Sequence, residues 1–242
     1  RVVELLIITT LPAMVLAEKG LPSFGLVAAT LIGGTLAAGA SNAFNMVIEA
    51  DTDKLMARTS KRPLVTGSVT RTQAIIFACI LTVLSLLIFE IFTTELATLL
   101  TALAIFYYVV IYTIILKPNT SQNIVWGGAA GCMPVLIGWA AVTGSLTLVP
   151  VAFFLVVFFW TPPHFWALAI KYKDDYSAAG IPMLPSVSTQ SNVINQMWFH
   201  TIAMVVSSAA MIQLAGLPVW VLCATVLLGA VFTFQLFALK EN

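Results

Sequence analysis

Charge is what this 242-residue sequence has least of: Asp, Glu, Lys and Arg make up 9% of it, against 60% apolar residues. Soluble domains carry about a quarter charged residues, so the composition excludes an ordinary soluble domain. A net charge of +1 gives no general attraction to nucleic acid. The alternation of polar and apolar residues that marks a membrane β-barrel is missing as well. The composition therefore predicts an all-α membrane protein.

Cysteine is also scarce. Cys79, Cys132 and Cys223 lie far apart within apolar segments, a spacing that excludes a disulfide framework or a cysteine metal site. We expect all three to be small core residues. A cleavable signal pattern is missing, and because residue 1 is Arg1 rather than methionine, we expect the chain to begin inside a longer protein.

Long apolar runs dominate the chain, and helices that cross a bilayer need about 20 such residues each. Eight runs are suitable, at residues 2–17, 22–48, 73–90, 96–116, 122–142, 148–170, 193–215 and 217–238. Two long polar connections, 49–72 and 171–192, follow the second and the sixth run. We therefore predict a polytopic membrane bundle of eight transmembrane helices, forming one domain over residues 1–242 from two four-helix halves.

The positive charges predict an orientation. If the chain starts in the cytoplasm, all of the 11 basic residues except Lys19 fall on the cytoplasmic side. Cytoplasmic connections of membrane proteins carry an excess of Lys and Arg. The distribution therefore predicts a multi-pass protein of the plasma membrane whose two long polar connections face the cytoplasm.

A third of the scarce charges gathers in one short stretch, because seven of the 21 (11 basic and 10 acidic) lie between Glu49 and Arg62. Asn45, Glu49 and Asp53 are spaced i, i+4, i+8, which places their oxygen atoms in one column on a helix, whereas Asp51 points elsewhere. One amide and two carboxylates suit a hard cation such as Mg²⁺, which binds few protein oxygens and keeps positions for water and phosphate. The column therefore predicts a magnesium site.

Basic residues follow the acid column within two helical turns. Arginine forks match phosphate oxygens, so this order predicts a site that holds a diphosphate and stabilises it as a leaving group. The candidates for this contact are Lys54, Arg58 and Arg62. The alternative for these bases is a solvated connection that binds anionic lipid headgroups.

A second acidic pair, Asp174 and Asp175, follows the sixth run, with Lys171 and Lys173 beside it. Adjacent carboxylates disfavour joint ionisation unless a cation compensates. Because the pair lies four runs after the first column, we expect both to reach the same mouth of the bundle. An ordinary interfacial turn is the alternative.

His164 interrupts an apolar run, and an ionisable residue inside a membrane span is a functional candidate by default. A hydrogen-bonded core histidine is the alternative. Trp160, Phe165 and Trp166 could form the wall of a flat pocket or could simply pack in the core. We interpret His200 as structural.

Several motifs together resemble the UbiA-type intramembrane prenyltransferases. The family's first acidic signature, N-x-x-x-D-x-x-x-D, corresponds to Asn45, Glu49 and Asp53. Four runs are similar to the branch of the family that farnesylates protoheme IX: DKLMARTSKRPL (53–64), NIVWGGAAG (123–131), WTPPHFWALAI (160–170) and DYSAAGIPMLP (175–185). The resemblance covers nearly the whole chain.

The resemblance implies an enzyme of the bilayer that transfers farnesyl from farnesyl diphosphate to a vinyl group of protoheme IX, with Mg²⁺ as cofactor and heme A synthase as a partner. It assigns the metal to Asn45, Glu49 and Asp53. It assigns the diphosphate to Lys54, Arg58, Arg62 and Lys173, and catalytic roles to His164, Lys171, Asp174 and Asp175.

The sequence departs from the family pattern in several places. Glu49 replaces the middle aspartate of the first signature, and Val135 stands where a second proline is expected after Pro134. The second signature normally has spaced aspartates, whereas Asp174 and Asp175 are adjacent. The family usually has nine membrane helices, so a ninth helix and a polar N-terminal tail are expected beyond this chain.

Two other functions fit part of the pattern. A prenyltransferase of the same fold could use another aromatic ring or a chlorin as acceptor, although the segment WTPPHFWALAI argues against it. A membrane transporter would place acids and helix breaks at the bilayer midplane, whereas the acids here lie at one face.

Overall fold

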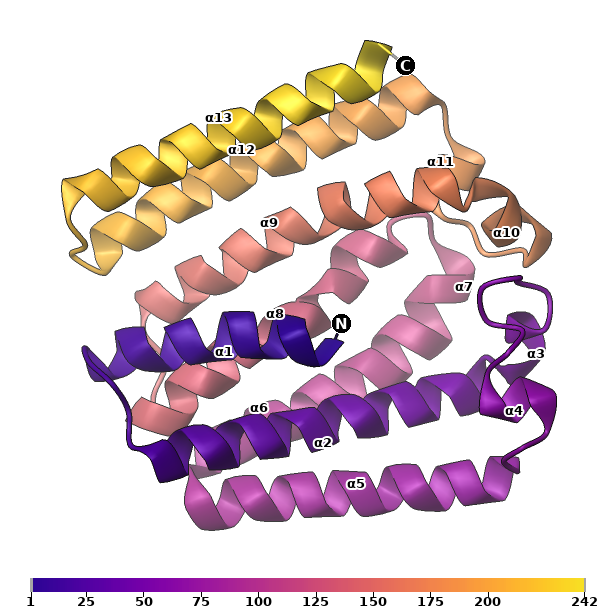
Figure 1. The fold of residues 1–242 in the computed structure, drawn as a ribbon, viewed down its shortest axis with the longest axis horizontal. Coiled ribbons are helices and arrows are strands. Elements are labelled where there is room, and N and C mark those ends of the chain that lie inside the picture. The colour runs from indigo at the N-terminus through magenta and orange to yellow at the C-terminus, as the bar shows by residue number, and fades with distance from the viewer. Residues whose placement is uncertain (1, 242) are drawn as a thin grey trace.

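The computed structural model describes residues 2–241, and the side chains of residues 6–234, as a bundle of long helices (Figure 1). The long helices are α1 (Val2–Glu18), α2 (Phe24–Ile48), α5 (Arg71–Phe92), α6 (Glu95–Phe106), α8 (Asn123–Thr143), α9 (Leu148–Lys171), α12 (Gln190–Leu214) and α13 (Val219–Glu241). The short elements are α3 (Ala50–Asp53), α4 (Pro63–Thr66), α7 (Lys117–Asn119), α10 (Lys173–Ala178), α11 (Leu184–Val187) and the π-helix η1 (Tyr107–Leu116). Each predicted apolar segment is helical, so the all-α prediction is confirmed.

The helices have the length and composition of membrane spans. The described residues include six helices that are long and apolar enough to cross a bilayer. One of these is the continuous rod Glu95–Asn119, made of α6, η1 and α7. The described apolar parts of α1 and α13 are shorter. Large apolar side chains such as Leu87, Phe199 and Leu227 are exposed on the outer faces, as suits surroundings of lipid rather than water. The protein is therefore a multi-pass membrane protein; Arg1, on which the predicted orientation partly rests, lies outside the described residues.

Polar residues at the segment ends explain where the helices begin and turn. Thr70 caps α5 in a capping box with Gln73, and Thr94 and Thr189 cap α6 and α12 with their hydroxyls. Gly144 follows α8 with a positive φ of 65°, a conformation that glycine adopts without a steric penalty. Thr94 and Gly144 belong to short connections at the end of the bundle opposite the polar ones, whereas Thr70 and Thr189 end the two long polar connections.

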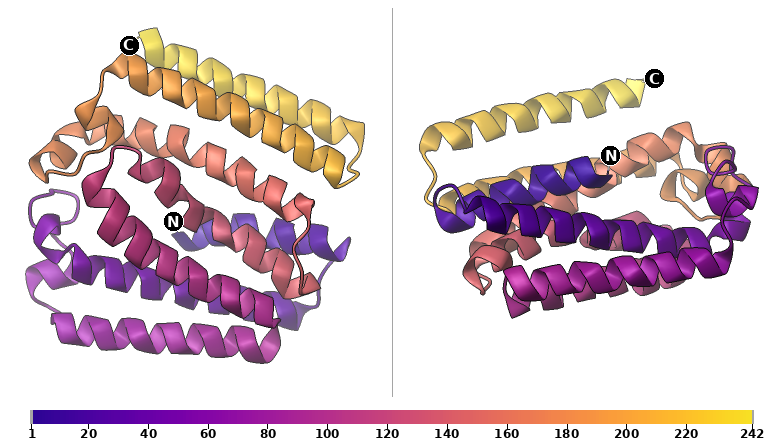
Figure 2. Two further views of the ribbon diagram at one scale, coloured as in Figure 1. Left: turned by 180° about the vertical axis from the view of Figure 1, so that it is seen from behind. Right: turned by 60° about the horizontal axis from the view of Figure 1, so that its bottom comes forward.

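The helices interlock across the two predicted halves (Figure 2). Within the halves, α2 packs along α5 and α9 along α12. Between them, α1 and α6 both pack against α8, so α8 lies at the centre of the fold. In accordance with this, α8 has the most buried face of the six spans. Helix α13 packs against α12 at the edge of the bundle.

The two long polar connections meet at one end of the bundle. The connection that carries α3 and α4 lies beside the one that carries α10 and α11 (Figure 1). The two connections also share a hydrophobic cluster, to which Met56 and Ile181 both belong. The prediction that both acidic clusters reach the same mouth of the bundle is therefore confirmed.

The cysteine prediction was wrong for two of the three residues. Cys132 is buried, but Cys79 and Cys223 are exposed on the outer faces of α5 and α13. In a membrane bundle a weakly polar thiol loses little by facing outward, because the lipid outside is as apolar as the core. Burial of cysteine in water-soluble proteins is therefore a poor guide here.

Candidate active site

The acid column lies where α2 ends. Glu49 interrupts the helix with φ −93° and ψ 5°, ending α2 and beginning α3. Hydrogen bonds from the Glu49 N–H to the Asn45 carbonyl (2.9 Å) and from the Asp53 N–H to the Glu49 carbonyl (2.8 Å) cross the interruption. Asn45 and Asp53 are 5% and 3% exposed, and Glu49 is partly buried. The three side chains keep their four-residue register, although no single unbroken helix carries them.

Asp53 is paired with a base from the loop that follows it. Its Oδ2 atom accepts a hydrogen bond from Arg62 Nη1 at 2.6 Å, and the Asp53 side chain is only 4% exposed. The buried hydroxyl of Thr59 donates to the Asp53 backbone carbonyl at 2.9 Å and folds the loop back toward the column. A buried carboxylate needs such a partner, because desolvation of an unpaired charge is costly. Of the predicted diphosphate residues, Arg62 thus lies directly at the column.

The other two column residues are held by the rod of α6, η1 and α7. Lys117 Nζ lies 2.5 Å from Glu49 Oε1, with both side chains less than one-fifth exposed. The Asn45 amide Nδ2 donates to Thr113 Oγ1 at 3.2 Å. Neither Thr113 nor Lys117 was predicted as a site residue. Lys117 was visible as a lone base ending an apolar run, but its partner could not be identified without knowing which helices are neighbours.

Asp51 points away from the column, as predicted, and anchors the loop at the surface. Its two carboxylate oxygens bind Lys54 Nζ at 2.9 Å and Arg71 Nη2 at 2.6 Å. The hydrogen bonds and positive charges of Lys54 and Arg71 hold the pKa of the Asp51 carboxyl below its ordinary value. Lys54, predicted to contact the diphosphate, is therefore directed to Asp51 and not toward the column.

Two tyrosines of η1 connect the column with its surroundings. The Tyr108 and Tyr112 rings lie 5.4 Å apart between centroids, on the helix whose Thr113 contacts Asn45. Tyr108 also lines a cavity together with Asn42 of α2. Tyr176 of α10 packs against the hydrophobic cluster that contains Met56 of the first connection, so the two polar connections lie together here. Arg58 is exposed and has no ion pair among the described residues.

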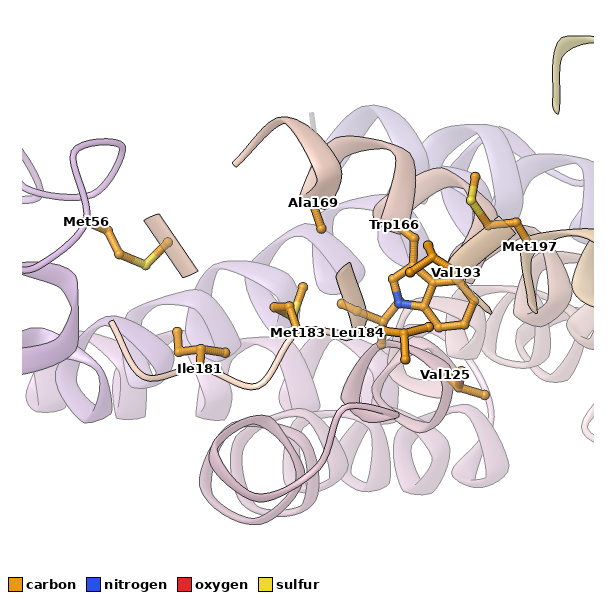
Figure 3. Close-up of a cluster of buried hydrophobic side chains, with 10 residues drawn as sticks. Met56, Val125, Trp166, Ala169, Ile181, Met183, Leu184, Val193 and Met197 are labelled. Carbon is orange, nitrogen blue, oxygen red and sulfur yellow. The ribbon is translucent and has the colours of Figure 1, made fainter. Parts of the chain in front are cut away.

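A hydrophobic cluster joins the two polar connections (Figure 3). Met56 from the first connection and Ile181, Met183 and Leu184 from the second are each at most 8% exposed. Trp166 of α9 is fully buried in the same cluster, which confirms the packing interpretation for this residue. Because residues of both connections belong to this cluster, it holds the two loops together at one end of the bundle.

The second acidic pair is less enclosed than the column. Asp174 is exposed and Asp175 half-buried in the first turn of α10, and neither forms an ion pair within the part of the chain that the structure describes. Lys173 is exposed, and Lys171 lies over the Tyr172 ring at 5.9 Å from its centroid. These four residues reach the same end of the bundle but are not brought into contact with the column.

His164 is exposed rather than buried. Its ring stacks on Trp160 at 4.4 Å between centroids and meets Phe165 edge-on at 5.4 Å. The alternative of a hydrogen-bonded core histidine is therefore wrong for His164. It is correct for His200, which is buried and whose Nδ1 lies 2.8 Å from the Gln196 carbonyl.

An apolar cavity extends into the bundle from the region of the column. Tyr108 and Asn42 line it at this end, and Thr30 and Phe89 line it near the opposite side of the bundle. Along α2, from Asn42 to Thr30, it spans about 18 Å at 1.5 Å per residue. Small residues of α2 and α8 leave the space open: Gly34, Ala37, Ala38, Ala130 and Gly131. Its shape and lining suit a long hydrocarbon chain.

The column has the chemistry of a magnesium site that shares its ligands with a substrate. Among the described residues, no three His, Cys, Asp or Glu side chains gather to form a complete metal cage. Mg²⁺ normally keeps several positions for water and phosphate, and binds one or two carboxylates. Glu49 and Asp53 supply those carboxylates and Asn45 a neutral oxygen, so the residues present fit the ion.

Comparison with known proteins agrees with this geometry. The model of the UbiA prenyltransferase family matches residues 6–242, and the chain belongs to this family. In fold, it is similar to a UbiA homolog from Archaeoglobus fulgidus bound to DMAPP and Mg²⁺, at 18% identity and a TM-score of 0.76, over 99% of this chain and 84% of that one. A UbiA homolog from Aeropyrum pernix has the same TM-score at 16% identity, over 97% and 88% of the two chains.

The chain has much higher sequence identity to several curated relatives than to these structures. The chain is 51% identical to a protoheme IX farnesyltransferase of Frankia casuarinae, over 97% of this chain and 81% of the relative. It is 49% identical to a protoheme IX farnesyltransferase of Rhodococcus jostii, over 89% and 72% of the two chains. The resemblance drawn from the motifs is confirmed, and the chain is a prenyltransferase.

Proposed function

We propose that this protein transfers the farnesyl group of farnesyl diphosphate to protoheme IX. The bond between farnesyl C1 and the diphosphate oxygen breaks, and C1 bonds to the terminal carbon of a heme vinyl group. Water then adds to the adjacent carbon and loses one proton, which gives a hydroxyethylfarnesyl side chain. The products are heme O and diphosphate. The observation that carries the proposal is the column of Asn45, Glu49 and Asp53 at one end of an apolar cavity.

The diphosphate is held between the column and its bases. When bound, Mg²⁺ supplies charge compensation for the departing diphosphate. Arg62 and Lys117, which pair with Asp53 and Glu49, can turn to the diphosphate oxygens once the carboxylates bind metal. Arg58, which is exposed on the same loop as Arg62, would add a third positive charge. Positive groups fixed before the reaction stabilise the leaving group without reorganisation.

The farnesyl chain occupies the apolar cavity. A cavity about 18 Å long matches an extended chain of this class, and its walls are mostly Ala, Gly, Leu, Ile and Phe. Tyr108 belongs both to the cavity and to the surroundings of Glu49, so C1 would lie near this side chain. Enclosure by apolar walls also excludes water from the allylic cation until the heme has reacted.

The acceptor lies on the side of His164. Heme needs a flat, mostly apolar slot with a few polar groups. The stacked rings of Trp160 and His164 form such a face on α9, and the His164 imidazole adds a polar group to it. Asp174, Asp175, Lys171 and Lys173 complete the opposite side of the mouth in this proposal.

The surroundings of the reaction follow from the distribution of charge. Because the basic residues gather at the polar end, we place this end in the cytoplasm and the protein in the plasma membrane. A heme A synthase, which consumes heme O, would be a partner. Cysteines placed at 54–70 and 172–190 should react with a membrane-impermeant reagent only from the cytoplasm, and those at 143–147 only from outside. Labelling of the two polar connections from opposite faces would contradict this orientation.

One assay tests the reaction. Purified protein with farnesyl diphosphate, Mg²⁺ and protoheme IX should release diphosphate and form heme O in equal amounts, as measured by mass spectrometry. His164→Ala should raise the KM for heme more than it weakens binding of farnesyl diphosphate. Prenylation of 4-hydroxybenzoate with heme left unchanged would overturn the assignment of heme as the acceptor. Absence of diphosphate release with either acceptor would overturn the proposed reaction.

A further inference from the structure

We propose that Thr113 of the π-helix η1 is a positioning residue for the metal site, because it fixes which atom of the Asn45 amide faces the cation. The inference rests on the proposed function, since it concerns the same site. Thr113 lies outside both the acid signature and the basic loop.

The hydrogen bonds of Thr113 leave one orientation for the amide. Thr113 is 3% exposed. Its hydroxyl has a single proton, which it donates to the Tyr108 carbonyl at 2.9 Å. Toward Asn45, 3.2 Å away, it can therefore only accept, so the amide nitrogen must face it. The Asn45 Oδ1 atom then points away from η1 and receives no hydrogen bond from the described residues. A free carbonyl oxygen is what Mg²⁺ requires.

The π-helix is the reason that Thr113 can do this. Other buried threonines of this chain, such as Thr101 and Thr201, donate to the carbonyl four residues before them. Thr113 donates to the carbonyl five residues before it, which is the spacing of a π-helix. Six of the seven residues 109–115 are β-branched, which disfavours tight α-helical turns. The wider turns set Thr113 against α2, and π-helical segments are frequent at functional sites.

The register of the next contact supports the same conclusion. Lys117 follows Thr113 by four residues, as Glu49 follows Asn45, and the two pairs are each 68 residues apart (113 − 45 and 117 − 49). One face of η1 and α7 therefore contacts two successive members of the column. Residues that orient metal ligands in this way tune affinity without touching the ion.

The test compares metal binding in matched threonine variants. Mn²⁺, which is visible by electron paramagnetic resonance, replaces Mg²⁺. It is titrated into the protein in the presence of inorganic diphosphate. Thr113→Val should weaken Mn²⁺ binding by about 10- to 100-fold, whereas Thr113→Ser, which keeps the hydroxyl, should stay within about threefold of wild type. Thr201→Val is the control, because Thr201 is equally buried and bonds only to a backbone carbonyl of α12.

A double-mutant cycle separates positioning from folding. In an Asn45→Ala background, Thr113→Val should cause no further loss of Mn²⁺ affinity, because the group it orients is gone. An equal loss in both backgrounds, or wild-type affinity in Thr113→Val, would overturn the inference and leave the proposed function standing. Failure of the wild type to bind Mn²⁺ with diphosphate would overturn the metal site itself. If Thr113→Val does not fold, Thr113→Ala carries the same prediction.

Discussion

Lys117 and Glu49 form an ion pair at 2.5 Å between α7 and the end of α2, with side chains that are 17% and 11% exposed. Thr113 contacts Asn45 at the same sequence separation. Two successive contacts in one register show that α2 and the rod of α6, η1 and α7 run past each other in the same direction. The rod therefore forms a second wall of the acid column.

Loss of the Lys117 charge should destabilise the protein and impair the site together. Lys117→Met leaves the Glu49 carboxylate largely buried without a partner, which costs on the order of 3 kcal/mol. We expect a thermal midpoint lower by several degrees in detergent, and a large decrease in kcat/KM for farnesyl diphosphate.

The double variant Glu49→Gln with Lys117→Met distinguishes these two effects. It removes both charges and leaves none unpaired, so its thermal midpoint should return toward that of the wild type. Diphosphate release should stay low, because the column has lost a metal ligand. Recovery of activity along with stability would mean that the pair is only structural.

The two aspartates of α3 give a matched comparison of site and surface. Asp53→Asn should nearly abolish diphosphate release at saturating Mg²⁺, because the 4% exposed carboxylate at Arg62 is a proposed metal ligand. Asp51→Asn, two residues away and 69% exposed, should retain near wild-type turnover. Glu49→Asp should be tolerated, since the family signature carries aspartate there. A fully active Asp53→Asn enzyme would exclude the column as the metal site.

The column could be predicted from the sequence because its spacing is local. Asn45, Glu49 and Asp53 are joined by backbone hydrogen bonds four residues apart, so periodicity alone placed them together. The break at Glu49 could not be predicted, because it leaves this spacing unchanged. The apolar runs likewise located the helices, since a run of about 20 apolar residues has the length of a helix that crosses a bilayer.

The partners of the column could not be predicted in the same way. Contacts of Thr113 and Lys117 with α2 depend on which helices are neighbours and on their register, and lipid-facing and core-facing residues look alike in a membrane protein. The π-helix adds to the difficulty, because it changes the period on which sequence analysis relies. Lys54 shows the converse error: it stands next to Asp53 in sequence but bonds to Asp51.

The anchoring of the first polar connection should depend on pH. Lys54 and Arg71 lower the pKa of Asp51, so their stabilising effect is present above the ordinary aspartate pKa of about 3.9. It is lost as the pH falls through the lower, folded-state pKa. Hydrogen exchange of residues 54–70, corrected for intrinsic rates, should therefore stay constant from pH 7 to 5 and increase below about pH 4. Asp51→Asn should show the faster exchange already at pH 7 and lose this dependence.

Two glycines of α8 should respond in opposite ways, and this tests where the farnesyl chain lies. A Cβ atom at Gly127 would collide with the ring of Tyr112, so Gly127→Ala should lower the thermal midpoint and displace η1 from the column. A Cβ atom at Gly131 meets no other atom within 4 Å, and Gly131 lines the cavity. Gly131→Leu should therefore fold normally but fill the space proposed for the chain. We expect its KM for farnesyl diphosphate to rise by about tenfold, roughly the loss of one or two buried methylene contacts, while dimethylallyl diphosphate, which is too short to reach this depth, binds as in the wild type. If Gly131→Leu keeps the wild-type thermal midpoint and the wild-type KM for both donors, the farnesyl chain lies elsewhere.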